Sequence, residues 1–122
     1  MIARWLIIVA SIVLAGCGDA TEGQPEGEKQ LLPSDPLLAS LYQRSCRNCH
    51  AIVASGAPQT GDALAWEPRL AKGMSALVDN VIAGYGTMPR GGLCPQCTRE
   101  QHAALIEFMA TPAQPANAGA SE

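Results

Sequence analysis

The sequence predicts an all-α domain with three to five short helices. Apolar residues recur at helical spacing in three separate segments, and no segment alternates apolar and polar residues as a half-buried strand does. All three segments lie within residues 36–111, which form the expected domain. A domain of this size has a small core and commonly needs a further stabilising group. The chain contains a single Phe, so aromatic side chains do not supply the missing apolar volume.

The first helix is expected to begin near Pro36, since proline is favoured in the first turn of a helix, and to run into Cys46. Residues 51–73 are rich in glycine and proline and are expected to be a loop, which at this length usually serves a site. The apolar stripe of the first helix consists of Leu37, Leu38, Leu41 and Tyr42.

The second helix is expected over residues 75–85 and is ended by glycines. The third begins at Thr98, because Gln101 three positions later completes a capping-box pattern. The apolar faces consist of Leu77, Val78, Val81 and Ile82 in the second helix and of Ala104, Leu105, Phe108 and Met109 in the third.

The string Cys46-Arg47-Asn48-Cys49-His50 is typical of a site for covalent attachment of c-type haem. Two thiols three positions apart can reach two vinyl groups on one edge of a porphyrin, and the adjacent imidazole can bind the iron. We therefore predict one haem c, linked by thioethers to Cys46 and Cys49, with His50 as an iron ligand. A buried porphyrin would also supply the apolar volume that the domain lacks.

The first residues are typical of an export signal that is cleaved before Cys17. Arg4 precedes an apolar run of roughly 11 residues, which is too short to span a bilayer as a helix. The run ends in Leu14-Ala15-Gly16-Cys17, which resembles a bacterial lipobox. The prediction is a signal peptide over residues 1–16 and a lipid-modified Cys17, with an ordinary cleaved signal and an incidental cysteine as the alternative.

Two flanking segments are predicted to be flexible. Residues 17–35 are acidic and contain few apolar side chains, and residues 112–122 are rich in Ala and Pro and are expected to be a disordered tail. A lipidated Cys17 followed by this tether would hold the domain on the periplasmic side of a bacterial membrane. The sequence does not distinguish the inner from the outer membrane.

Charge excludes one class of partner. The formal net charge is −3, and five of the 11 acidic residues lie in the short tether. Within residues 36–111 basic side chains outnumber acidic ones by one, so the domain lacks the strongly basic face that nucleic-acid binding requires.

The order of these features resembles the class I cytochromes c, and most closely the small bacterial cytochrome c5 type. The resemblance covers about residues 37–109 and implies an all-α fold in which the first and last helices cross and the haem lies in a crevice with one edge exposed. The matching pieces are the haem motif, Gly56-Ala57-Pro58, Gly61-Asp62, Trp66, Arg69, Gly84-Tyr85-Gly86-Thr87-Met88-Pro89, Gly91-Gly92 and Cys94-Pro95-Gln96-Cys97.

Met88 is the candidate for the second axial ligand. It lies in a glycine-rich segment that cannot be a helix interior, and Pro89 favours an extended backbone before it. Met74 and Met109 lie at helical spacing and are expected in the core. The alternatives are that Met88 only touches the haem edge, or that His102 is the ligand instead, although His102 is expected to face solvent on the last helix.

The resemblance also implies roles for three residues around the haem. The carbonyl of Pro58 would accept the second ring N–H of the haem histidine and so set its tautomer. Trp66 and Arg69 match positions that contact the haem propionates, with a core Trp and a surface Arg as the alternative.

The resemblance implies a disulfide between Cys94 and Cys97. All five cysteines would then have a role. A redox-active pair is one alternative, although no βαβ pattern surrounds it. A four-cysteine zinc site with Cys46 and Cys49 is another.

The resemblance implies a one-electron carrier that cycles between Fe(III) and Fe(II) with His/Met ligation, with redox proteins as partners, no small-molecule substrate and no catalytic residue. The alternative is an electron-accepting subunit or domain of a periplasmic oxidoreductase. Arg47, Lys72 and Arg90 are candidates for positive contacts with a partner.

Overall fold

The computed structural model describes residues 31–113. The predictions for the signal peptide, Cys17, most of the tether and most of the tail lie outside these residues. The helices are α1 (Pro36–Arg44), α2 (Arg47–His50), the 3₁₀ helix η1 (Val53–Ser55), α3 (Ala63–Leu70), α4 (Met74–Ala83), the 3₁₀ helix η2 (Arg90–Leu93) and α5 (Arg99–Ala110). Residues 31–113 contain no strand, only an isolated bridge between Tyr85 and Met88, so the all-α prediction is confirmed.

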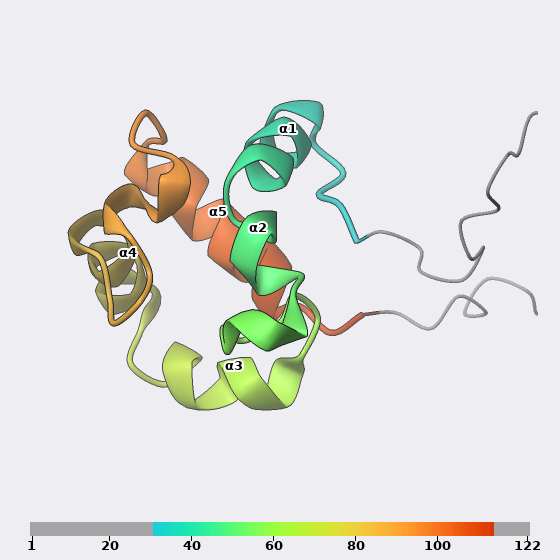
Figure 1. The fold of residues 1–122 in the computed structure, drawn as a ribbon, viewed down its shortest axis with the longest axis vertical. Coiled ribbons are helices and arrows are strands. Elements are labelled where there is room, and N and C mark those ends of the chain that lie inside the picture. Colours follow the sequence, from blue (N-terminus) through green and yellow to red (C-terminus); the bar gives the residue numbers. More distant parts are fainter. Residues whose placement is uncertain (1–30, 114–122) are drawn as a thin grey trace, which may run out of the picture.

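Helix α5 crosses the middle of the domain, with α1 and α2 on one side of it and α4 on the other, while α3 closes the lower end (Figure 1). The first and last helices pack together, and the ring of Tyr42 meets that of Phe108 edge to face at 5.1 Å between centroids. None of the helices described is long and apolar enough to cross a membrane.

Local chemistry explains where α1 begins and ends. The carboxylate of Asp35 accepts the N–H of Leu38 at 2.8 Å, and Pro36 occupies the first turn. The helix does not run into Cys46 as expected. The backbone leaves helical geometry at Ser45 (φ −128°, ψ −84°), whose hydroxyl donates to the carbonyl of Leu41. This break lets α2 start in a new direction.

Two details of the predicted apolar stripes are wrong. Leu37 is 57 % exposed, whereas Leu41 and Tyr42 are buried. Ile82 is likewise exposed on α4, where Leu77, Val78 and Val81 form the buried face. Both exposed side chains lie at the margin of their helical face, where helical spacing alone does not decide burial.

The predicted loop over residues 51–73 contains helix α3 and the short η1, so this prediction is wrong. Asp62 caps α3 by accepting the N–H of Ala65 at 3.1 Å. Pro68 lies inside the helix, where it lacks the N–H of a helical ladder and makes the sequence resemble a loop. Trp66, the buried residue of α3, compensates by packing into the core.

The last helix begins as predicted. The hydroxyl of Thr98 accepts the N–H of Gln101, and the side-chain carbonyl of Gln101 accepts the N–H of Thr98 at 2.9 Å, so the capping box is complete. Helix α5 then contributes Leu105, Ile106 and Met109 to the core, which confirms the core position of Met109.

Candidate functional site

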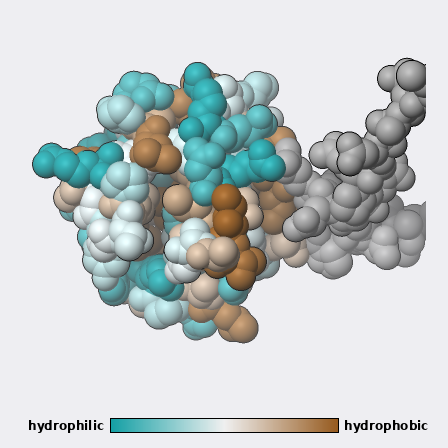
Figure 2. Space-filling model, in the orientation of Figure 1, coloured by the Kyte–Doolittle hydropathy of each residue, from teal (hydrophilic) through white to brown (hydrophobic). Residues whose placement is uncertain are grey.

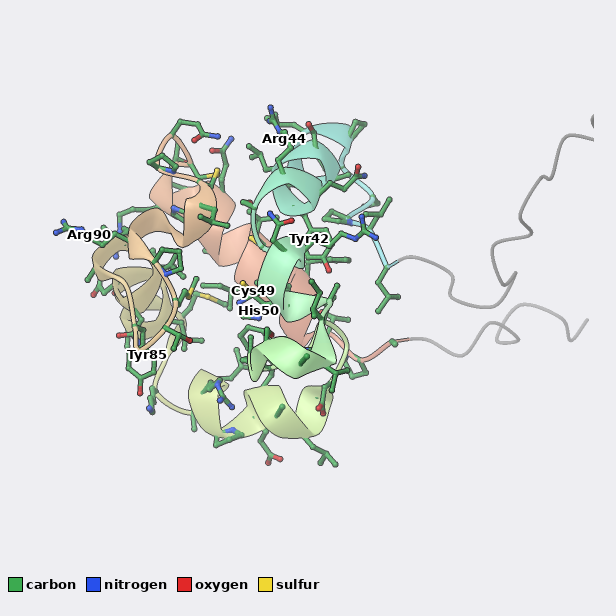
Figure 3. All side chains as sticks on the ribbon, in the orientation of Figure 1. Tyr42, Arg44, Cys49, His50, Tyr85 and Arg90 are labelled. Carbon is green, nitrogen blue, oxygen red and sulfur yellow. A yellow bond between two sulfur atoms is a disulfide. The ribbon has the colours of Figure 1, made fainter. Side chains whose placement is uncertain are left out.

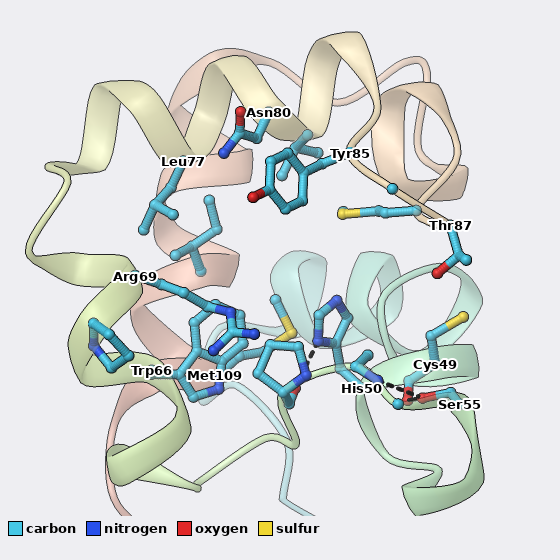
Figure 4. A pocket seen from close by; sticks show the side chains of 18 of the residues that line it. Cys49, His50, Ser55, Trp66, Arg69, Leu77, Asn80, Tyr85, Thr87 and Met109 are labelled. Atoms are coloured by element: carbon cyan, nitrogen blue, oxygen red, sulfur yellow. Dashed lines mark hydrogen bonds between the residues drawn. The ribbon is translucent and has the colours of Figure 1, made fainter.

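A cavity of about 470 Å³ opens between α2, α3, α4 and the segment that follows α4 (Figure 4). Its size falls within the range of about 300–1,000 Å³ that is common for ligand and cofactor sites. Its walls are mainly apolar, and the residues that line it include no carboxylate. The positively charged side chains among them are Arg69 and Lys72.

His50 and Cys49 come from α2 and line this cavity (Figures 3 and 4). Nδ1 of His50 lies 2.7 Å from the carbonyl oxygen of Pro58. Because a carbonyl can only accept, the ring proton belongs on Nδ1, and Nε2 keeps a free lone pair. Burial is the main cause of a lowered pKa for His50; the Pro58 carbonyl opposes this shift and the charge of Arg69 adds to it. The arrangement favours a neutral imidazole suited to bind a metal ion.

Three further hydrogen bonds hold the segment that carries Pro58. The N–H of Thr60 donates to the carbonyl of His50 at 2.7 Å. The side-chain amide of Gln59 donates to the carbonyls of Ala57 and Ile52 at 2.7 and 3.2 Å. Sequence reasoning missed Gln59, because nothing in its local pattern shows that its amide bridges two carbonyls.

Trp66 packs beside the histidine. Its ring lies 5.6 Å from that of His50 with an angle of 28° between the planes. Its indole N–H donates to the carbonyl of Gln59 at 2.9 Å. The indole N–H is thus engaged by the backbone, and the contact between Trp66 and a haem propionate stays a prediction.

Arg69 and Lys72 are the positively charged side chains that line the cavity. Arg69 is half-buried, and its guanidinium donates to the carbonyl of Ala65 within α3. The ammonium of Lys72 lies 6.0 Å from the ring centroid of Tyr85, a cation–π distance. Figure 4 shows Arg69 at one side of the cavity and Cys49 at the other. Lys72 and Tyr85 are cavity residues that the sequence did not reveal as a pair.

Met88 lines the same cavity from the segment between α4 and η2. The backbones of Tyr85 and Met88 exchange two hydrogen bonds, of 3.1 and 2.9 Å, which close a tight turn. Pro89 follows in an extended conformation. His50 and Met88 are thus brought to one cavity from segments far apart in the sequence.

His102 does not face solvent, so this expectation is wrong. It is only 4 % exposed and lies on the face of α5 that carries Leu105 and Ile106, three and four positions later. Desolvation lowers the pKa of His102. It is not among the residues that line the cavity, and the structure does not bring it to the site of His50.

The cysteines of the described residues fall into two pairs. Cys94 and Cys97 are joined by a disulfide, in which Cys46 and Cys49 take no part. Burial raises the pKa of the Cys46 thiol. Within residues 31–113 no group of three or more His, Cys, Asp or Glu side chains is arranged to hold a metal ion. The four-cysteine zinc site therefore finds no support.

The residues around the cavity fit a haem. The cavity is apolar, has a cysteine and a neutral imidazole at one wall and a thioether at another, and carries its positive charges where the carboxylates of a haem could be neutralised.

Apolar side chains also gather on the surface below α1 and α2, while hydrophilic ones cover these helices (Figure 2). In the segment after α2, Ile52 and Val53 are exposed.

The comparisons with known proteins agree with this reading. The family model described as cytochrome C oxidase, cbb3-type, subunit III, matches residues 36–109. Cytochrome c-555 of Chlorobaculum thiosulfatiphilum is 42 % identical over 74 residues, which cover 57 % of this chain and 86 % of that protein. Cytochrome c5 of Ectopseudomonas mendocina is 30 % identical over 71 residues, which cover 57 % and 82 %.

Two solved structures are similar in fold and sequence. A mono-haem ferrocytochrome c from Shewanella putrefaciens superposes with a TM-score of 0.56 and 42 % identity, covering 62 % of this chain and 94 % of that one. A chain in the electron transfer complex of nitrite reductase with cytochrome c gives a TM-score of 0.53 and 39 % identity, covering 62 % and 93 %.

Proposed function

Because this chain belongs to the cytochrome c family and carries one haem c bound covalently through Cys46 and Cys49, we propose that it is a one-electron carrier in which His50 and Met88 are the axial ligands. The bound haem supplies a one-electron Fe(III)/Fe(II) couple, whose potential the ligands and their surroundings set.

The observation that carries this proposal is the meeting of His50 and Met88 in one cavity, with Nδ1 of His50 already engaged by Pro58. The hydrogen bond leaves Nε2 as the free nitrogen and holds the ring in one orientation. Trp66 packs against the same ring and limits its rotation. Pro58 and Trp66 therefore keep the neutral imidazole of His50 in one orientation, in which it can bind iron.

The choice of Met88 over Met109 follows from position. Both line the cavity, but Met109 is buried and lies beside His50 and Trp66, on the wall of the histidine (Figure 4). A second axial ligand must approach from the other side of the iron. Met88 comes from a different wall and is half-buried, with its backbone held by the turn to Tyr85.

Arg69 and Lys72 are proposed to face the two haem carboxylates. They are the charged side chains that line the cavity, Arg69 lies on the side opposite Cys49 (Figure 4), and no acidic side chain lines the cavity to compete with them. This assigns Lys72 a role beside Arg69, whereas Trp66 instead supports the wall.

Ligation is tested by absorption spectra of the ferric protein, in which a weak long-wavelength charge-transfer band reports sulfur bound to iron. Met88→Ala should abolish this band, while Met109→Leu, which keeps the volume of a core residue, should retain it. A band that survives Met88→Ala would rule out Met88 as the ligand.

The remaining parts of the proposal concern attachment and partners. We propose a lipid on Cys17 that places the domain on the periplasmic side of a membrane. Fractionation of cells that produce the wild type and Cys17→Ser tests this: the variant should move from the membrane to the soluble fraction. Recovery of both proteins in the same fraction would contradict the anchor.

An electron-accepting subunit of a periplasmic oxidoreductase is the second candidate. The description of the matched family model names an oxidase subunit, and one structural neighbour comes from a complex of nitrite reductase with cytochrome c. Solubilisation from native membranes followed by size-exclusion chromatography separates the two candidates. A carrier elutes alone, whereas a subunit elutes with its enzyme in fixed proportion.

A further inference from the structure

The turn after Met88 contains two buried glycines with positive φ. Gly91 has φ +72° and Gly92 has φ +56°, a region that side-chain-bearing residues rarely adopt. The N–H of Gly92 donates to the carbonyl of Pro89 at 3.0 Å, and the N–H of Cys94 donates to the carbonyl of Gly91 at 2.8 Å. The disulfide of Cys94 closes the next turn. The backbone at Gly92 is therefore held from both sides.

The two glycines differ in what faces them. A Cβ on Gly92 would lie 2.9 Å from Cε of Met88 and 3.3 Å from Cγ1 of Val81. A Cβ on Gly91 would meet nothing closer than Cβ of Pro95, at 3.7 Å. Both positions share the same backbone requirement, but only Gly92 adjoins the terminal methyl group of Met88.

We infer that Gly92 is a positioning residue for the thioether of Met88, which it holds in place by leaving room for the methyl group. The sulfur is bonded to this methyl group, so the space at Gly92 limits the directions in which the sulfur lone pairs can point. Cγ1 of Val81 in α4 borders the same space, at 3.3 Å from the position of a Cβ on Gly92. The inference rests on the proposal that Met88 is the axial ligand.

A methyl group at position 92 would displace the end of a flexible side chain rather than backbone. Its main effect should therefore be on the position of the Met88 sulfur, while the cost of positive φ should be similar at positions 91 and 92. This difference separates positioning of the ligand from a general need for glycine in the turn.

The experiment compares Gly92→Ala with Gly91→Ala as a matched control in the full-length holoprotein. The measurements are the sulfur–iron band, the reduction potential and the affinity of ferric protein for added imidazole, which competes with the thioether. Gly92→Ala should weaken the band and bind imidazole about tenfold more tightly, equivalent to about 1.4 kcal/mol. Gly91→Ala should leave all three close to wild type.

Equal behaviour of the two variants, whether both are altered or both unaltered, would overturn the inference. Wild-type protein without a band that depends on Met88 would instead overturn the proposed ligation, and this outcome is read independently from Met88→Ala. If Gly92→Ala does not fold, a measurement on the wild-type protein still tests the inference. Nuclear Overhauser effects of the ferrous protein should connect the α protons of Gly92 to the methyl group of Met88, and their absence would contradict the inference.

Discussion

Gln59→Ala is predicted to destabilise the histidine wall of the cavity although this side chain does not line the cavity. The amide of Gln59 donates to the carbonyls of Ala57 and Ile52, at 2.7 and 3.2 Å. Its own backbone carbonyl accepts the indole N–H of Trp66. Gln59 thus links the segment that presents the Pro58 carbonyl to Ile52 on one side and to Trp66 on the other.

The magnitude follows from the two bonds that are lost. A typical intramolecular hydrogen bond contributes about 0.5–1.5 kcal/mol net. Ile52 is exposed, so its carbonyl regains water and that bond counts at the low end, whereas the shorter bond to Ala57 counts nearer the middle. The expected loss is about 1.5 kcal/mol. In a domain of 60–100 residues, 1 kcal/mol lowers the melting temperature by about 4–8 °C.

The assay is urea-induced unfolding of the ferric holoprotein, followed by circular dichroism. Gln43→Ala is the reference, since Gln43 is an exposed residue of α1 and its replacement should change stability by less than about 0.5 kcal/mol. Gln59→Glu should be at least as destabilising as Gln59→Ala at neutral pH, because an ionised carboxylate cannot donate to a carbonyl. If Gln59→Ala matches Gln43→Ala in midpoint and slope, the bridging role is refuted.

Three further predictions concern other contacts. Tyr42→Phe removes the 2.8 Å hydrogen bond to the hydroxyl of Thr60 and should cost about 1 kcal/mol by urea unfolding; no loss would show that this bond is replaced by water. Burial lowers the pKa of His102 below its usual 6.5, so the imidazole binds a proton more readily in the unfolded chain, and stability should fall as pH drops through 6.5. His102→Leu should flatten this pH dependence between pH 7.5 and pH 5. An equal slope in both proteins would contradict the prediction. Replacing Lys72 and Arg90 together by Glu should slow electron transfer to an anionic metal-cyanide reagent about tenfold at low salt, and the difference should be lost at high salt. Arg44→Glu on α1, which lies away from Tyr85 and Arg90 (Figure 3), should have little effect. Unchanged rates at low salt would exclude Lys72 and Arg90 from the docking surface.

Most of the site's chemistry could be predicted from local sequence, because the relevant residues lie close together along the chain. The haem motif places two thiols and an imidazole within five positions, and Thr98 and Gln101 carry their capping box within four. Such features need no knowledge of the tertiary structure.

The errors arise where distant packing decides. Helix α3 forms around Pro68 because Asp62 caps it and Trp66 is buried, whereas the glycines and prolines of residues 51–73 suggested a loop. The position of His102 was accessible from the sequence, since Leu105 and Ile106 place it on the buried face, but the charged neighbours suggested solvent. The roles of Gln59 and Gly92 depend on atoms brought together only by the fold.

The two walls of the cavity are built separately. The histidine wall is joined by hydrogen bonds between His50, Pro58, Thr60, Gln59 and Trp66, and the methionine wall by the turns from Tyr85 to Cys97. No hydrogen bond within residues 31–113 connects the first set with the second. Distant changes without shared partners normally add in free energy. Any coupling between Gln59 and Gly92 variants must therefore pass through α4 and α5 packing or through the proposed ligation by His50 and Met88. Because Met88→Ala removes the proposed ligand together with the side chain that packs at Gly92, coupling that survives in its background belongs to helix packing.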